Sequence, residues 1–362
     1  MTTSDKAQQS SYRSSFLSNS IHALKSPLLA ILGALLIGML LILISGKDPI
    51  AAFAALVDGA FGGNNNANLV ATLRRSAPVV GMGISAAISL RAGFFNIGGE
   101  GQLVLGGLTA GVVATYLHLP GPVVIITAIF AAAFIGGLYA LIPIFFELKI
   151  AFPILVSSLL LNYPAKYMAT YLVKTYFRDI SAGIVATNVI PKAVELPKLF
   201  PGSQLHIGIP IILLIVIASA IVIYRTVPGY EITMSGLNPK FAEYGGIDRK
   251  RLGYRVMFMS GCVAGIVGAV EVLGVHFRYV DGSLASPLYA WIGIMAALLS
   301  QFNPWGVLIA GFFFAAVKTG GYGMQRLVDV PKELSEIIQA VIIMLVSIRT
   351  TISFRKRSGV KR

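Results

Sequence analysis

The chain has 362 residues, of which 56% are hydrophobic and only 12% are charged. Soluble domains carry about 25% charged residues, so this density is too low to cover a water-facing surface. A pair of soluble domains is therefore excluded, and the composition predicts an all-α polytopic membrane protein. We attribute the net charge of +14 to basic cytoplasmic loops rather than to nucleic-acid binding, and we expect no nucleic-acid partner.

About ten apolar runs are long enough to cross a hydrocarbon core as helices, which rise 1.5 Å per residue. They are residues 27–46, 76–92, 95–117, 121–146, 153–174, 207–225, 254–275, 286–300, 304–321 and 332–350. The second, third and eighth are short or interrupted by glycine, as broken helices would be. Matching spans two to five with spans seven to ten reverses their orientation, which predicts an inverted repeat.

The distribution of Lys and Arg predicts that both termini are cytoplasmic. The chain then divides into a cytoplasmic tail (1–26), a transmembrane domain (27–350) and a basic cytoplasmic tail (351–362). Within the domain, 175–206 becomes an external loop with Pro191, Pro197 and Pro201, and 227–252 becomes a cytoplasmic loop.

The most unusual stretch is RAGFFNIGGEGQL at 91–103, which places four glycines and three polar side chains between apolar runs. Irregular backbone survives in a membrane only when it is buried in protein or faces water. We therefore interpret Asn96, Glu100 and Gln102 as groups that line a polar route, with Asn162 in the fifth span as a weaker candidate. The alternative is a tight cytoplasmic turn in which Glu100 pairs with Arg91.

The segment FNIGGEGQ at 95–102 resembles the FNIGxEGQ signature of bacterial ABC-importer permeases of the nucleoside type. These belong to a larger superfamily that includes ribose and branched-chain amino-acid permeases. The resemblance extends over roughly residues 70–350, through AALLSQFNPWG at 296–306, GGYGMQ at 320–325 and PKEL at 331–334. It departs at 153–163, where relatives often carry an acidic residue that PILVSSLLLNY lacks, so any role of that residue is not carried over.

The loop RTVPGYEITMSGLNPKFAEYGGID at 225–248 resembles the superfamily's contact with its ATPase, where a short coupling helix docks. From the residues alone, Pro239 suits a first helical turn, with Asn238 as its cap. This predicts a short helix from Pro239 to Tyr244 that ends at two glycines. A helix of one or two turns needs a partner to be stable. The resemblance implies that the contact involves Tyr230, Glu231, Gly236, Asn238, Pro239, Ala242, Gly245 and Gly246.

The resemblance implies a permease subunit that forms the translocation path for nucleosides in a bacterial cell membrane. Its expected partners are an ABC ATPase, a second related permease and an extracytoplasmic substrate-binding lipoprotein. No Walker A motif occurs, so ATP and Mg would be bound by the ATPase, and this chain is expected to be neither an enzyme nor a cofactor-binding protein. Amides and carboxylates suit nucleoside hydroxyls and base edges, and Phe94 or Phe95 is expected to stack on the base.

One alternative is an ion-coupled secondary transporter of a small polar solute, with Glu100 and Glu271 as proton carriers. Glu271 lies in the outer half of the seventh span, where it reaches an external vestibule or pairs with Arg278. Only the ABC interpretation needs the docking loop, which therefore discriminates between the two. A membrane-embedded enzyme is disfavoured, because no nucleophile and base set is recognisable.

Overall fold

The computed structural model describes residues 32–33, 35–63, 66–341 and 344, and all regular structure in these residues is helical apart from two isolated β-bridges. The labelled helices are α2 (Pro49–Phe61), α3 (Ala67–Arg91), α4 (Gly99–Tyr116), α5 (Gly121–Ile150), α6 (Ile154–Leu172), η2 (Val173–Phe177), η3 (Lys192–Val194), α7 (Gly208–Arg225), α8 (Val227–Leu237), α9 (Pro239–Tyr244), α10 (Arg249–Glu271), η4 (Val272–His276), α11 (Tyr289–Leu299) and α12 (Pro304–Val328). Residues 35–44 and 333–341 are helical as well. The predicted all-α polytopic membrane fold is confirmed. The predicted inverted repeat stays a prediction.

Among the described residues, four helical segments are long and apolar enough to cross a membrane: α5, α7, α10 together with η4, and α12. Helices α3, α4 and α6 have 25, 18 and 19 residues but carry more polar side chains. The span predicted to begin at residue 76 belongs to a helix that begins at Ala67. The predicted start lies directly after Arg74 and Arg75. A charged side chain lowers the hydropathy of a segment but does not end a helix. The predicted first and last spans lie partly outside the described residues.

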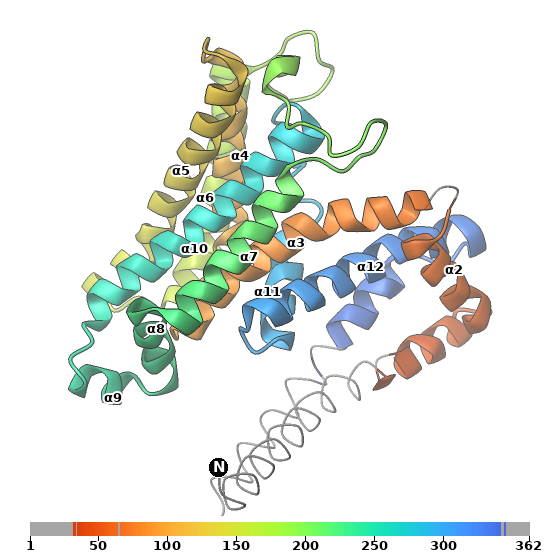
Figure 1. Cartoon of the computed structure of the whole chain (residues 1–362). Helices are drawn as coiled ribbons and strands as arrows, with labels where there is room; N and C mark the ends of the chain where they lie inside the picture. The colour runs from red at the N-terminus through yellow and green to blue at the C-terminus, as the bar shows by residue number, and fades with distance from the viewer. Residues whose placement is uncertain (1–31, 34, 64–65, 342–343, 345–362) are drawn as a thin grey trace, which may run out of the picture. The chain divides into compact units, whose positions relative to one another are not determined.

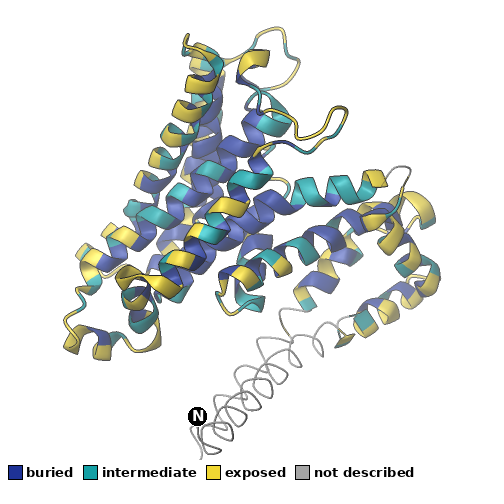
Figure 2. Ribbon diagram, viewed as in Figure 1, coloured by how far each residue is buried: buried dark blue, intermediate teal, exposed yellow. Residues whose placement is uncertain are grey.

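The chain divides into two compact units, one formed by residues 1–62 and 317–362 and the other by 63–316. In the second unit α10 packs against α5, α4 and α3 (Figure 1). Glycines permit this close approach: a Cβ on Gly265 would meet the Ala132 carbonyl of α5, and one on Gly106 of α4 would meet Gly265. Small residues at such positions let helix backbones approach closely, as is common in membranes. Helix α10 is accordingly buried along most of its length, whereas α5 exposes its outer face (Figure 2).

The two ends of this second unit are built differently. Helices α8 and α9 lie at one end, beside the start of α10, and the loop 178–206 lies at the opposite end (Figure 1). This loop is held to the segment after α10 by backbone hydrogen bonds of 2.9 Å, from Thr187 N to the Tyr279 carbonyl and from Ile190 N to the Phe277 carbonyl. The two predicted loops therefore lie at opposite ends of the unit.

The predicted short helix in the first of these loops is confirmed as α9. The Asn238 side chain accepts a hydrogen bond from Phe241 N at 3.1 Å and caps the helix. After the helix, Gly246 takes a φ of +83°, a left-handed conformation that glycine adopts without steric cost. The cap and the terminal glycine explain why six residues form a separate helix between α8 and α10.

The first unit has its own small core. Ile42, Ala52 and Ala55 pack with Met324 and Val330. Asp48 caps the start of α2, and its carboxylate accepts a hydrogen bond from Ile50 N at 2.8 Å. An ion pair of 3.3 Å joins Lys47 to Asp329.

Candidate functional site

The glycine-rich motif forms the junction between two helices. Helix α3 ends at Arg91, and residues 92–98 form a non-helical linker that reverses at Gly93, where φ is +82°. Helix α4 then begins at Gly99, which puts Glu100 in its first turn. The predicted interruption of the helices is confirmed, and most of the linker is buried inside the second unit.

Two amide side chains hold this linker through a reciprocal pair of hydrogen bonds. Asn96 Nδ2 donates to Gln102 Oε1 at 3.2 Å, and Gln102 Nε2 donates to Asn96 Oδ1 at 3.1 Å. Asn96 Nδ2 also donates to Ser260 Oγ of α10 at 3.0 Å. Ser260 in turn donates to the carbonyl of Ser85 on α3 at 2.8 Å. The network satisfies buried polar groups that would otherwise be costly in a membrane.

The contact with Ser260 places this network along helix α10. Ser260 is the middle residue of α10 (Arg249–Glu271), and a helix rises 1.5 Å per residue, so it lies about 16 Å from either end of the helix. Asn96 and Gln102 therefore lie near the middle of a spanning helix rather than at the end that carries α8 and α9. The depth of this segment in the membrane stays a prediction.

Asn162 of α6 fastens the linker from the other side. Its Oδ1 accepts from Gly101 N at 2.8 Å, and its Nδ2 donates to the Ile97 carbonyl at 3.1 Å. Asn162 is 3% exposed. Asn96, Gln102 and Asn162 thus form hydrogen bonds within the protein, and in this conformation they hold the linker and the start of α4 in position.

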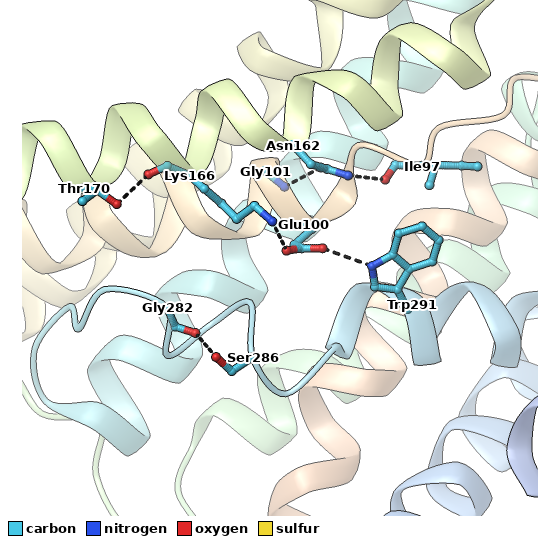
Figure 3. A network of polar contacts seen from close by, with 9 residues as sticks. All are labelled: Ile97, Glu100, Gly101, Asn162, Lys166, Thr170, Gly282, Ser286 and Trp291. Carbon is cyan, nitrogen blue, oxygen red and sulfur yellow. Dashed lines mark hydrogen bonds and ion pairs between the residues drawn. The ribbon is translucent and has the colours of Figure 1, made fainter. Parts of the chain in front are cut away.

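Glu100 has two partners that sequence reasoning missed, and they reach its carboxylate from opposite sides (Figure 3). Lys166 Nζ of α6 lies 3.0 Å from Oε1, and Trp291 Nε1 of α11 donates to Oε2 at 3.1 Å. The pairing of Glu100 with Arg91 that the alternative assumed is wrong. Arg91 instead donates to Thr233 Oγ1 at 3.1 Å, because the end of α3 faces α8.

The two side chains of the ion pair differ in their exposure. The Glu100 side chain is 9% exposed, whereas that of Lys166 is 35% exposed, and Trp291 is 37% exposed. The Lys166 ammonium also lies 4.9 Å from the centre of the Tyr163 ring. A carboxylate, an ammonium and an indole thus meet in one place, with the latter two accessible, and together they are able to donate, accept and stack.

The two phenylalanines of the motif differ in accessibility. Phe94 is 2% exposed, and the Arg249 guanidinium lies over its ring at 5.5 Å. Phe95 is 48% exposed. Of the two rings expected to stack on a base, only Phe95 is accessible in this structure.

Helix α8 connects the loop at the end of the unit with the linker. Ser235 Oγ donates to the Ala92 carbonyl at 3.3 Å, and a Cβ on Gly236 would collide with the Arg91 carbonyl. Gly236 therefore lies directly against the backbone that leads into the motif. Ala242 is buried, whereas Tyr230, Gly245 and Gly246 are exposed around it and Glu231 is half-buried. Their docking role stays a prediction.

Only one of the two missed residues has a recognisable signal in the sequence. Lys166 is a charged residue in an apolar span, four positions after Asn162, and intramembrane charges mark functional sites by default. Trp291 gives no such signal, since an interfacial tryptophan has the same appearance in the sequence. Glu271 does not pair with Arg278, which lies instead 3.8 Å from Asp179.

Comparison with known proteins gives consistent matches. Residues 68–347 match the family described as branched-chain amino acid transport system, permease component. The guanosine ABC transporter permease NupP of Bacillus subtilis is 30% identical, over 91% of this chain and 94% of its own length. A glucose ABC transporter permease, TsgB13 of Haloferax volcanii, is 29% identical over 88% and 86%. The nucleoside ABC transporter permease NupB of Lactococcus lactis is 26% identical over 92% and 93%. No solved structure gives a significant match.

Proposed function

The chain belongs to the permease family of branched-chain amino acid transport systems, and from this premise we propose that it forms the translocation path of an ATP-driven importer of nucleosides. Two of the three relatives named above are permeases for guanosine or nucleosides. The third relative is named for glucose. Like the sugar of a nucleoside, glucose is a ring with several hydroxyls, but it has no base. Both solutes call for hydrogen-bonding groups, and only a nucleoside calls for aromatic stacking.

The observation that carries the proposal is the contact of Glu100 with both Lys166 and Trp291. A carboxylate accepts hydrogen bonds from sugar hydroxyls or from base N–H groups, and an ammonium donates to hydroxyl or carbonyl oxygens. The indole of Trp291 and the ring of Phe95 supply faces for a base. Glu100 and Lys166 can thus replace the hydrogen bonds that a polar solute loses when it leaves water.

Helix α8 supplies the mechanical connection in this proposal. An ATPase that docks on α9 would move α8, and α8 contacts the linker at Ala92 and Arg91. Moving the linker displaces Glu100, because Glu100 lies in the first turn of α4, directly after the linker. The solute site then opens toward one side of the membrane at a time. ATP and Mg are bound by the ATPase subunit in this scheme.

We further propose a second related permease as the pairing subunit and a substrate-binding lipoprotein on the side of the loop 178–206. Both termini are then cytoplasmic, on the side of α9. This orientation follows from the basic residues around α9, including Arg249, Lys250 and Arg251.

The proposal is tested by uptake of radiolabelled guanosine and uridine into cells that express the full system, with wild-type or Walker-dead ATPase. We expect uptake that requires the active ATPase and is blocked by excess unlabelled nucleoside but not by ribose. Uptake that ignores the ATPase and collapses with an uncoupler would establish the ion-coupled transporter instead. ATPase-dependent uptake of glucose alone would overturn the nucleoside assignment.

A further inference from the structure

A second group of buried polar side chains lies away from Glu100. In the described part of the chain five buried side-chain atoms lack a hydrogen-bond partner, and four of them belong to one group. They are Arg74 Nε, His206 Nε2, Glu271 Oε2 and His276 Nε2. Most buried polar groups in proteins have a hydrogen-bond partner, so four unmatched atoms on neighbouring elements need an explanation.

The four side chains come from separate elements that pack together. Arg74 lies on α3, which packs against α7, α10 and α11, and its charge acts on Glu271 and on both histidines. The His206 ring packs against Gly274, three residues after Glu271, where a Cβ would leave no room for it. Glu271 also interacts with the Tyr289 hydroxyl at the start of α11.

His206 and Glu271 are the most buried members of the group, at 2% and 1% exposed. His206 Nδ1 accepts a hydrogen bond from Gly208 N at 3.2 Å, and burial together with the Arg74 charge lowers the pKa of this imidazole to about 4. The neutral ring then carries its proton on Nε2, which becomes a donor without an acceptor. Glu271 Oε2 is an acceptor without a donor.

The position of this group along α10 places it on the side of the loop 178–206. Glu271 is the last residue of α10, eleven residues after Ser260, which is about 16 Å along the helix. It therefore lies toward the loop 178–206, at the end opposite α9. Helix α11 joins the two polar places, because its first turn carries both Tyr289 and Trp291.

We propose that Arg74, His206, Glu271 and His276 form a second solute site, which binds the sugar hydroxyls of the substrate before it reaches Glu100. A hydroxyl both donates and accepts, so it matches an unpaired carboxylate oxygen beside unpaired N–H groups. The guanidinium of Arg74 disfavours a metal cation at the same place. This inference rests on the proposed function only in the choice of nucleoside as the hydroxyl-bearing solute.

The test measures binding to the assembled permease–ATPase complex in nanodiscs, without the binding protein. The probes are tritiated guanosine and 2′,3′-dideoxyguanosine, which lacks the sugar's secondary hydroxyls. We expect the wild-type complex to bind guanosine at least tenfold more tightly. Glu271→Leu should abolish this preference, and Glu271→Gln should keep part of it, because an amide oxygen still accepts a hydrogen bond while losing the charge-assisted strength.

Glu147→Gln is the matched control, since Glu147 is a carboxylate at the end of α5 with a protein partner, Ile154 N; it should keep the full preference. Complex size and melting temperature show whether each variant assembles. An assembled Glu271→Leu complex that keeps the preference would overturn the site. Equal binding of both probes to the wild type would overturn it too. In either case water would be left as the occupant of the site. A wild type that transports only glucose would overturn the nucleoside assignment instead, and glucose against its 2-deoxy derivative would then decide the site by the same comparison.

Discussion

Lys166 Nζ lies 3.0 Å from Glu100 Oε1, although the two residues are 66 positions apart in the sequence. The pair joins the first turn of α4 to the middle of α6, and Trp291 occupies the second carboxylate oxygen. Such a pair either only stabilises the packing of the helices or also takes part in solute binding. These two roles predict different behaviour when the charges are exchanged.

Glu100→Leu is expected to abolish uptake without preventing membrane insertion, since it removes the acceptor at the solute site. The exchange Glu100→Lys with Lys166→Glu should restore assembly through an inverted ion pair. Uptake should still fall by more than 100-fold, because the Trp291 N–H then meets an ammonium. Uptake rates normalised to the membrane level of the protein provide the measurement. Normal uptake by either variant would refute a pathway role for Glu100.

Asn162→Leu is expected to destabilise the linker rather than to change substrate preference. The change leaves Gly101 N and the Ile97 carbonyl without their partner, at a cost of about 1–3 kcal/mol for each group. The melting temperature of the purified complex should fall, while the ratio of guanosine to uridine uptake stays constant. Leu160→Ala, at an exposed position on the same helix, is the control. A changed ratio with unchanged stability would mean that Asn162 contacts the solute.

Gly236→Val should uncouple ATP hydrolysis from uptake or prevent assembly, because the added side chain collides with the Arg91 carbonyl. Ala242→Leu should have a similar effect at the buried position of α9. ATPase activity and uptake are measured together in proteoliposomes. Gly183→Ala, which adds a methyl group in open space, should leave both unchanged. A Gly236→Val complex that assembles and transports normally would mean that the coupling contact lies elsewhere.

The loop 178–206 is expected to stay ordered under mildly acidic conditions. The Ser181 hydroxyl and amide donate hydrogen bonds to the Asp179 carboxylate, and these bonds hold the pKa of this carboxyl below its ordinary value. The Arg278 charge lowers the pKa further, by a smaller amount. A pKa that is lower in the folded state contributes stability above about pH 4, and this contribution is lost as the pH falls through the folded value. Limited proteolysis of the loop should therefore be constant from pH 7 to about pH 5 and increase below about pH 4. Asp179→Asn should remove that acid-dependent step, and a variant that keeps it would assign it to another group.

The sequence by itself determined the features that depend on local chemistry. Apolar runs of membrane-spanning length predict an all-α membrane protein, because lipid leaves the backbone no partner outside its own helix. The glycines around Asn96 predict the break between α3 and α4. Asn238 and Pro239 predict where α9 begins, and Gly245 and Gly246 predict where it ends, because caps act within one turn of the helix. Each of these features arises from neighbours along the chain.

Only the tertiary structure decided which side chains meet across helices. Lys166 rather than Arg91 pairs with Glu100, since α6 packs beside α4 while the end of α3 faces α8. Ser260 places the motif beside the middle of α10, although it is 164 positions from its partner Asn96. Packing also buries Phe94 and leaves Phe95 accessible. Hydrophobicity specifies that helices insert into lipid but not which of them pack together, because lipid is as apolar as the helix faces. The choice of neighbours therefore rests on glycine contacts and polar pairs that form only in three dimensions.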